Sequence, residues 1–368
     1  MPYVQGDMKE LNRRAVFDMI AEVGEVSRVD IGNTLGISSP TVLKITSFLM
    51  GRGIVTLAGE EKTARGRRPQ LLRFDPDSLI GIGVDYDGST VKAAVCNYWG
   101  QQKGYAEQPA DDDFDMLMER VLPEMLDKLL KKSDVEQANV CGVGICIPGA
   151  VNTAEAGVKL GALSGIRMGC TPAESAKLLR TRMDMQVYLF NDVNAAATGE
   201  YVLRKLRGED LVYISAGEGI GAGIILDGKL RTGKHFYTGE IAHIVFDPMF
   251  TTDISRPGWL EAQLSSVALQ ARFPAGQQNE QIDYVAQHLA LAIANICNIL
   301  DIETVILDGE WVKRMGSELM RLTAEYTARL CMFNVMLYTP SCKNPSLTGA
   351  ASMALELELD NVLMTTTE

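Results

Sequence analysis

Residues 211–243 read LVYISAGEGIGAGIILDGKLRTGKHFYTGEIAH, and this stretch organises the rest of the chain. Two apolar runs, at 211–214 and 224–226, flank a segment in which every second residue from 217 to 223 is glycine. Such runs, followed by an Asp-Gly pair, predict a β-hairpin. Glycine lets backbone N–H groups approach an anion, so the loop could cradle a phosphate. A tight turn with bulges explains the same spacing at least as well.

Composition limits the kinds of protein that this chain can be. At 368 residues it is long enough for two or three domains. The net charge of −12 excludes binding of nucleic acid over the whole surface, but residues 1–75 hold eleven Lys or Arg against nine Asp or Glu. A mildly basic module on an acidic body is therefore expected.

Cysteine usage and hydropathy indicate the compartment. The seven cysteines form no CxxC pair, and several lie in apolar runs, which is typical of buried thiols in a reducing compartment. No apolar run is long enough to cross a bilayer, and no secretory pattern follows Met1. We expect a cytoplasmic protein with no membrane partner and no disulfides.

Residues 1–75 have the order of a winged helix-turn-helix domain. The pattern predicts three helices and two strands, over 8–23, from Ser27 to Gly36, from Ser38 or Ser39 onwards, at 54–57 and at 70–74. Pro40 falls in the first turn of the third helix, where a missing N–H costs nothing.

Two groups of side chains suit DNA. Ser39, Thr41 and Lys44 face outward on the third predicted helix, where small and polar residues can enter a major groove. The segment between the two strands forms a wing with a basic tip, at Arg65, Arg67 and Arg68, suited to phosphates or to a narrow minor groove. A protein-docking module of the same shape, with the wing only a solvated loop, is the alternative.

The remaining residues alternate strands with helices, which predicts two α/β lobes. The first, 79–188, contains strands at 79–84, 91–96 and 140–147 and a helix near 114–131. The second, 189–368, contains the 211–243 hairpin, a helix at 282–300 and a last helix that begins near 348.

Four short motifs occur in an order that is typical of one protein family. They are Asp85-Tyr86-Asp87-Gly88-Ser89-Thr90, Leu189-Phe190-Asn191-Asp192-Val193-Asn194-Ala195-Ala196-Ala197, Gly239-Glu240-Ile241-Ala242-His243 and Gly258-Trp259-Leu260-Glu261. The set resembles the ROK family of bacterial sugar kinases and sugar-responsive repressors, over most of the chain. The resemblance implies a two-lobed, actin-like (duplicated ribonuclease H-like) ATPase-type fold with a cleft between the lobes. Asn12-Arg13-Arg14, Ser27-Arg28 and Gly66-Arg67-Arg68-Pro69 resemble the N-terminal module of the ROK repressors, which stand-alone ROK kinases generally lack.

The resemblance also implies a sugar pocket. Its residues here would be Asn191, Asp192, Glu240, His243 and Glu261. In ROK kinases the aspartate of the Asn-Asp pair takes the proton of the attacking sugar hydroxyl, and Asp192 holds that position. Read from the residues alone, an Asn-Asp pair before an alanine-rich run is a helix N-cap, a role that could coexist with sugar binding, and a lone histidine is more often a core residue.

Three departures from the family pattern change the expected chemistry. Segment 251–259 lacks the family's three zinc-binding cysteines, so we expect no structural zinc, with packing of Trp259 in its place. Asp87 and Glu218 put carboxylates into the two phosphate-binding loops, so we expect no ATP and no other cofactor. Segment 162–166 lacks the family's sugar-contacting asparagine, so the ligand need not be a common hexose.

These patterns together predict a sugar-responsive transcriptional repressor. It would bind operator DNA as a homodimer or higher homo-oligomer, with a kinase-like body in which Asp192 is vestigial as a catalytic residue. One alternative is an active ROK sugar kinase with an appended DNA-binding module. The other is a repressor that responds to no ligand.

Overall fold

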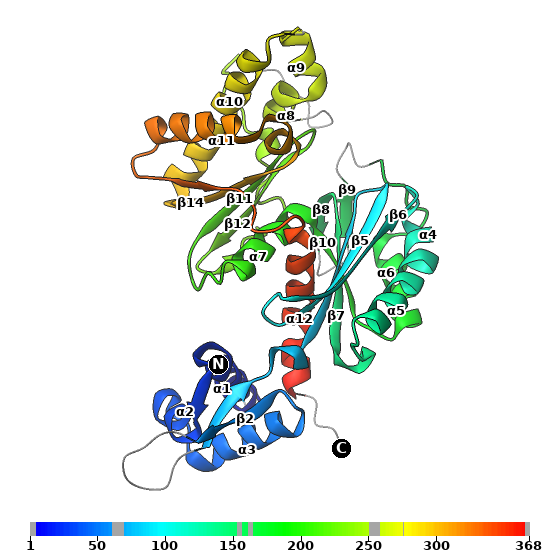
Figure 1. The fold of residues 1–368 in the computed structure, drawn as a ribbon, viewed down its shortest axis with the longest axis vertical. Helices are drawn as coiled ribbons and strands as arrows, with labels where there is room; N and C mark the ends of the chain where they lie inside the picture. Colours follow the sequence, from blue (N-terminus) through cyan, green and yellow to red (C-terminus); the bar gives the residue numbers. More distant parts are fainter. Residues whose placement is uncertain are drawn as a thin grey trace.

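The computed structural model describes residues 5–60, 70–152, 157–160, 165–249, 258–274 and 276–364. Three parts follow one another along its longest axis, a small N-terminal module and two α/β lobes (Figure 1). The N and C termini both lie at the module end of the molecule.

The N-terminal module has three helices and a three-stranded antiparallel sheet of order β1-β3-β2. Its elements are α1 (Gln5–Val23), β1 (Glu25–Ser27), α2 (Arg28–Leu35), α3 (Ser39–Gly51), β2 (Val55–Glu60) and β3 (Gln70–Phe74). Ser27 caps α2 by accepting from the Asp30 N–H at 3.2 Å, and Gly36 ends that helix with a φ of 66°, both as predicted. The segment between β2 and β3, with Arg65, Arg67 and Arg68, lies outside the described residues.

The first lobe is built on a five-stranded sheet of order β10-β7-β4-β5-β6. The strands are β4 (Ile80–Tyr86), β5 (Thr90–Asn97), β6 (Gln102–Pro109), β7 (Val140–Ile147) and β10 (Val187–Asn191), of which β4, β7 and β10 are parallel. One face packs against α4 (Phe114–Met116), the π-turn Leu117–Val121, α5 (Leu122–Lys132) and α6 (Pro172–Met183). Short elements complete the lobe: 3-10 turns at Pro76–Ser78 and Gln137–Asn139, and the β8 (Gly149–Asn152) and β9 (Gly157–Leu160) pair.

The second lobe contains the 211–243 hairpin. β11 (Leu211–Ala216) and β12 (Ile220–Leu226) pair antiparallel as the predicted hairpin, with Leu211 opposite Ile225 and Ala216 opposite Ile220. Gly221 and Gly223, expected in the loop, lie in β12. They sit in a sheet of order β13-β12-β11-β14-β15, with β13 (Lys229–Leu230), β14 (Thr304–Asp308) and β15 (Met336–Tyr338). The helices are α8 (Trp259–Leu264), α9 (Ser266–Arg272), α10 (Gln278–Leu300) and α11 (Glu310–Leu330).

The glycines of the hairpin serve a turn and a close packing contact. The Gly217 N–H donates to the Gly219 carbonyl at 3.1 Å, which closes the tight turn between β11 and β12. A Cβ on Gly223 would lie 2.5 Å from the Ala197 Cβ, so glycine lets α7 (Asp192–Leu203) lie directly on β12.

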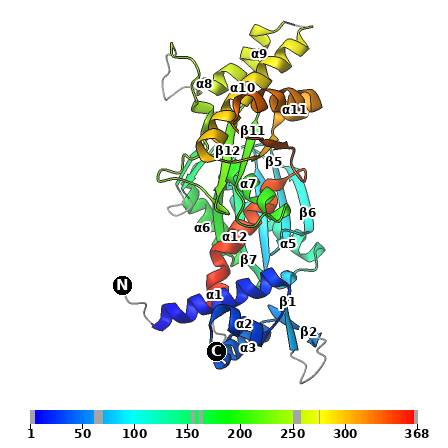
Figure 2. The same ribbon diagram turned by 90° about the vertical axis from the view of Figure 1, so that its left-hand side faces the viewer.

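The structure corrects the predicted place of the C-terminal helix. The helix α12 (Pro345–Met364) lies on the open face of the first sheet and against α7, and its last turns reach the N-terminal module (Figures 1 and 2). It does not belong to the second lobe, where the predicted boundaries placed it. Glycines on that face explain the difference, because a Cβ on Gly83 would lie 1.8 Å from the Leu347 carbonyl oxygen, and one on Gly144 2.2 Å from that of Ala350. The predicted boundary at residue 189 also falls inside β10, which ends at Asn191.

Candidate functional site

The first turn of α7 places Asn191 and Asp192 at the point where the chain leaves the first sheet. The Asn191 Oδ1 accepts from the Asn194 N–H at 2.8 Å and caps the helix, which confirms the interpretation made from the residues alone. Its Nδ2 donates to the Gly149 carbonyl at 2.9 Å and to the Asp192 Oδ1 at 3.1 Å. The Asp192 Oδ1 also accepts from the Val193 N–H at 2.9 Å, and the carboxylate interacts with its own backbone N–H as well.

Asp192 lies in a negative environment. Burial raises its pKa to about 7, helped by the nearby carboxylates of Asp85 and Glu240 and opposed by the Val193 N–H. Asp85, at the end of β4, was not among the predicted site residues. Its own pKa is raised by burial, and it accepts a hydrogen bond from the Ser346 hydroxyl at 2.6 Å. The two carboxylates and the start of α12 therefore meet at one place.

Glu240, His243 and Glu261 lie together on the second lobe. Burial raises the pKa of Glu261; His243 opposes the rise, and the carboxylates of Glu240 and Glu218 add to it. The charge of Glu240 also raises the pKa of Asp192, so the two groups of predicted pocket residues interact electrostatically. None of these three side chains makes a hydrogen bond to another residue in the described ranges. As far as the described residues go, these three side chains are thus available to hydroxyl groups.

Two glycines hold these residues in position. Gly239 has a φ of 90°, and a Cβ there would lie 1.7 Å from the Ala222 carbonyl oxygen, so the turn that bears Glu240 rests on β12. A Cβ on Gly258 would lie 2.2 Å from the Ala242 carbonyl oxygen, which fixes the start of α8, and with it Glu261, against the 3-10 turn Ile241–His243.

In the two loops that were compared with phosphate-binding loops, the carboxylates of Asp87 and Glu218 already accept hydrogen bonds from backbone N–H groups. The Asp87 Oδ1 accepts from the Ser89 N–H at 2.9 Å and from the Thr90 N–H at 2.8 Å. Burial alone would raise the pKa of Asp87, but these hydrogen bonds bring it below its ordinary value. Glu218 accepts from the Ser266 N–H at 3.1 Å and from its hydroxyl, at the N-terminus of α9. The backbone donors that an anion would use are thus partly filled from within the chain.

Trp259 packs in an aromatic cluster, as predicted. Its ring centroid lies 5.6 Å from that of Phe246, edge to face, and 6.0 Å from that of His288, stacked. Among the described residues no group of three or more His, Cys, Asp or Glu could hold a metal ion. Segment 251–257 lies outside them, and the absence of zinc stays a prediction.

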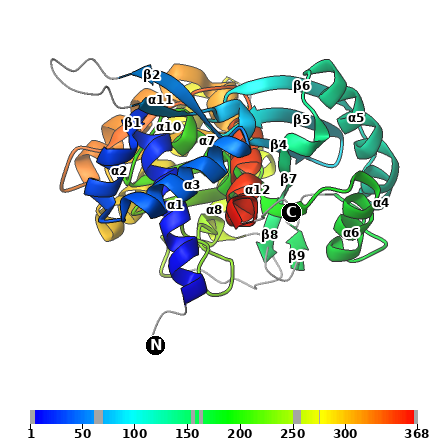
Figure 3. The same ribbon diagram turned by 90° about the horizontal axis from the view of Figure 1, so that it is seen from below.

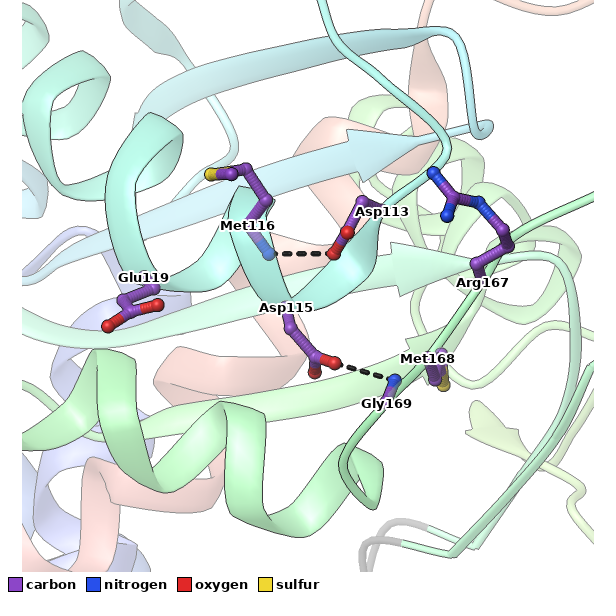
Figure 4. A pocket seen from close by; sticks show the side chains of 7 residues that line it. All are labelled: Asp113, Asp115, Met116, Glu119, Arg167, Met168 and Gly169. Carbon is purple, nitrogen blue, oxygen red and sulfur yellow. Dashed lines mark hydrogen bonds between the residues drawn. The ribbon is translucent and has the colours of Figure 1, made fainter.

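A hollow of about 410 Å³ on the first lobe lies apart from these residues (Figure 4). It is lined by Asp113, Asp115, Met116, Glu119, Arg167, Met168 and Gly169. Its polar groups largely satisfy one another: Asp115 accepts from the Gly169 N–H at 2.6 Å, and Arg167 pairs with Asp112 at 2.6 Å. None of the predicted site residues lines it.

On α3, Ser39 and Lys44 are exposed, and Thr41 is partly buried with its hydroxyl 2.9 Å from that of Ser38. Leu43, which the sequence did not single out, is 54% exposed beside Lys44. The opposite side of α3 is buried, at Val42, Ile45, Thr46 and Leu49.

The module that carries α3 is packed firmly on the rest of the chain (Figure 3). Leu355, Leu359 and Leu363 of α12 are buried in its core. Arg14 on α1 pairs with Glu356 at 2.7 Å and with Asp360 at 3.2 Å.

Comparison with known proteins agrees with this architecture. The model of the ROK family matches residues 81–356. The chain belongs to the ROK family. The predicted resemblance is thereby confirmed, together with the two-lobed, actin-like fold of its body. No helix in the described ranges is both long and apolar enough to span a membrane.

Relatives of this ROK protein include repressors. It is 29% identical to the xylose repressor of Caldicellulosiruptor bescii over 82% of this chain and 84% of the relative. It is 22% identical to the N-acetylglucosamine repressor of Escherichia coli O157:H7, over 82% and 81%. A crystal structure of a ROK family transcriptional regulator, a homologue of the E. coli MLC protein, matches with a TM-score of 0.79 and 20% identity, over 97% and 98% of the two chains. A ROK family glucokinase from Streptomyces griseus matches with a TM-score of 0.60 and 20% identity, over 75% of this chain and 99% of the kinase.

Proposed function

We propose that this protein is a sugar-responsive transcriptional repressor of the cytoplasm. Its N-terminal module acts as a winged helix-turn-helix domain that reads operator half-sites, within a homodimer or higher homo-oligomer. Its body binds a sugar or sugar derivative and needs neither ATP nor zinc. The repressors among its relatives support this role, as does the regulator that matches almost the whole chain.

The observation that carries the proposal is the link between the exposed face of α3 and the residues around Asp192. The module that presents Ser39 and Lys44 to solvent is packed onto α12, and the first turn of α12 bonds to Asp85 beside Asp192. A ligand can shift DNA affinity only if it binds two states of the protein differently. Continuous packing from the cleft to the module supplies a physical basis for two such states.

Free hydrogen-bonding groups support the sugar role. Asp192, Glu240, His243 and Glu261 offer acceptors or donors that are not used within the described ranges. A hydrogen bond to a charged group contributes about 1.5–3 kcal/mol, so a few of them suffice for a small polyol. D-xylose is the first effector to test, because the C. bescii relative is a xylose repressor.

DNA binding is tested by footprinting with the region upstream of the protein's own gene. Lys44→Ala should lower the slope of log Kd against log salt concentration by about 1, as expected when one phosphate contact is lost. Lys131→Ala, an exposed lysine on α5, is the matched control and should bind as the parent does. Failure of the parent to bind any such segment at low salt would refute the DNA role.

Sugar binding is tested by thermal shift against D-xylose, other pentoses, hexoses, amino sugars and sugar phosphates. A ligand at a hundred times its Kd should stabilise the protein by about 2.7 kcal/mol. Asp192→Asn should lose the shift, and Asp127→Asn, on the exposed side of α5, should keep it. DNA binding that is indifferent to every sugar would instead identify a ligand-independent repressor.

A sugar kinase with an appended module is the second candidate, and Asp192 favours it. A carboxylate whose pKa is about 7 suits a general base. Against it, the Asp87 carboxylate occupies amides of its own loop, and Glu218 puts a negative charge beside the other loop, where it bonds to the start of α9. Sugar-dependent release of ADP in a coupled assay would favour the kinase.

A further inference from the structure

The helix α12 runs from Asp85, near Asp192, to the N-terminal module. It has 20 residues, which corresponds to roughly 30 Å at the rise of an α-helix. Its first turns lie between α7 and the first sheet, and its last turns lie under α1 (Figures 1 and 2).

The first turn of α12 makes a hydrogen bond to Asp85. The Ser346 hydroxyl, on a residue that is 7% exposed, donates to the Asp85 Oδ2 at 2.6 Å. Asp85 in turn interacts electrostatically with Asp192, the residue that begins α7. Asp85 thus interacts both with the carboxylate of Asp192 and with the hydroxyl of Ser346.

Backbone contacts leave little freedom between α7 and α12. A Cβ on Gly349 would lie 1.7 Å from the Ala195 carbonyl oxygen, and one on Gly199 would lie 1.9 Å from that of Pro345. Since the two backbones touch directly, a shift of α7 displaces the first turns of α12 instead of being absorbed by side chains.

At its other end, α12 is attached to the DNA-binding module by polar and apolar contacts. Arg14 pairs with Glu356 and Asp360, and the Arg52 Nη1 donates to the Val362 carbonyl at 2.8 Å. Leu363 is fully buried in the module core. The module therefore follows the end of α12.

We propose that Ser346, acting through Asp85, is a positioning residue that transmits occupancy of the site at Asp192 to α12 and thereby to the orientation of the DNA-binding module. The inference rests on the proposed function. Sugar hydroxyls that donate to Asp192 stabilise its charged form, and the charge acts on the neighbouring Asp85. The Asp85 to Ser346 hydrogen bond changes with it, and the first turns of α12 shift together with α7.

The test measures coupling with the full-length protein. Calorimetry gives the Kd of D-xylose, and fluorescence anisotropy gives the Kd of a duplex from the protein's own promoter, with and without saturating D-xylose. In the parent, the larger of the two DNA Kd values, measured with and without D-xylose, should exceed the smaller by a factor of about 5 to 150, the usual range of allosteric coupling. Ser346→Ala should bring this ratio to within about twofold of unity while the sugar Kd changes less than about threefold. Ser346→Thr retains the hydroxyl and should restore the ratio.

Two further variants separate transmission from simple loss of stability. The Ser341 hydroxyl donates to Glu200 at 2.8 Å in the segment before α12, so Ser341→Ala removes a comparable hydrogen bond without touching Asp85 and should keep the parent ratio. Asp85→Asn removes the charge but can still accept from Ser346, and it should lose coupling even if Ser346→Ala fails to fold.

The outcomes are distinguishable. A parent ratio above five that persists in Ser346→Ala or, if that variant does not fold, in Asp85→Asn overturns the inference and leaves the proposed function intact. A parent that binds the duplex equally well with and without every sugar tested overturns the sugar response itself, and the inference with it.

Discussion

Gly349→Ala tests the contact between α7 and α12 directly. Gly349 lies in α12 where α7 crosses it, and an added Cβ would meet the Ala195 carbonyl oxygen at 1.7 Å, its carbon at 2.6 Å and the Gly199 nitrogen at 2.7 Å. All three are backbone atoms of a helix, so no side chain can rotate away. The helices must move apart to accept the methyl group.

Two opposing effects determine how much Gly349→Ala changes the free energy of unfolding. Alanine in place of glycine favours a helix by about 1 kcal/mol. Overpacking typically costs about 1–3 kcal/mol and occasionally more, and a radial gap of about 0.5–1 Å removes a quarter to a half of the dispersion energy of the atoms that line it. Because the contact is between backbones, we expect the upper part of this range, a net destabilisation of about 1–2 kcal/mol, or a Tm lower by roughly 2–8 °C.

Thermal and urea unfolding of the ligand-free protein measure this change, with Gly51→Ala as the matched control. Gly51 ends α3, and a Cβ there would meet nothing within 4 Å. The control should therefore be as stable as the parent or more stable by up to about 1 kcal/mol. If Gly349→Ala has the same Tm and urea midpoint as Gly51→Ala, the inference that the backbones of α7 and α12 are in direct contact is wrong.

Three further predictions concern stability. The pKa of Asp192 is raised from 3.8 to about 7 in the folded protein, so the free energy of unfolding should fall as the pH rises between these two values. Asp192→Asn removes the charge, so it should raise the Tm of the ligand-free protein at pH 8. The same variant should have no effect on the Tm near pH 4. Arg14→Ala, which removes ion pairs from a side chain that is 27% exposed, should cost about 1–2 kcal/mol in urea unfolding, whereas Arg321→Ala, at 51% exposure, should leave the unfolding midpoint close to that of the parent. Trp259→Ala should cost about 2–4 kcal/mol by the same assay, and elemental analysis of the parent should find less than about 0.1 zinc per chain if aromatic packing replaces the metal.

Local signals in the sequence predicted local structure well. The cap of α2 depends on Ser27 and on a neighbour three residues away, and the 211–243 hairpin depends on adjacent runs and turns. Asn191 was predicted as both a helix cap and a sugar ligand, and the structure confirms the cap. The cap could be predicted because it involves only the next few residues. Such interactions span a short length of chain and leave a visible pattern.

The place of α12 was not predicted, because its partners are far away in the sequence. A signal for it nevertheless exists: Gly81 and Gly83 alternate in β4, as Gly142 and Gly144 do in β7, and these four lie on one face of the sheet. Alternating glycine in two neighbouring strands indicates that another backbone approaches that face closely. Which helix approaches cannot be read from the strands themselves.

The same limit applies to Glu218. From its place between two glycines, we expected its carboxylate to oppose a phosphate, but the structure pairs it with Ser266, 48 residues later, at the start of α9. A motif shows which atoms a loop offers, whereas the fold determines which of them are already used. Asp85 was missed for a related reason, since its motif was compared with a phosphate loop, and its neighbours Asp192 and Ser346 come from α7 and α12.

If ATP has no place in the cleft, the sugar must supply all the free energy that shifts the lobes. A ligand moves a two-state equilibrium only by the ratio of its affinities for the two states, and a change from 1:99 to 99:1 requires a ratio of about 10⁴. A small sugar held by a few hydrogen bonds, each worth about 1.5–3 kcal/mol to a charged group, can reach that ratio only if two or more of them form in one state and not in the other. Asp192 directly follows β10 of the first sheet, whereas Glu240 and Glu261 lie in the second lobe, so a sugar that contacts all three would bind fully only when these elements are close. Division of the ligand contacts between two lobes, together with a rigid α12, would therefore let a small polyol control a DNA-binding module at the far end of the molecule.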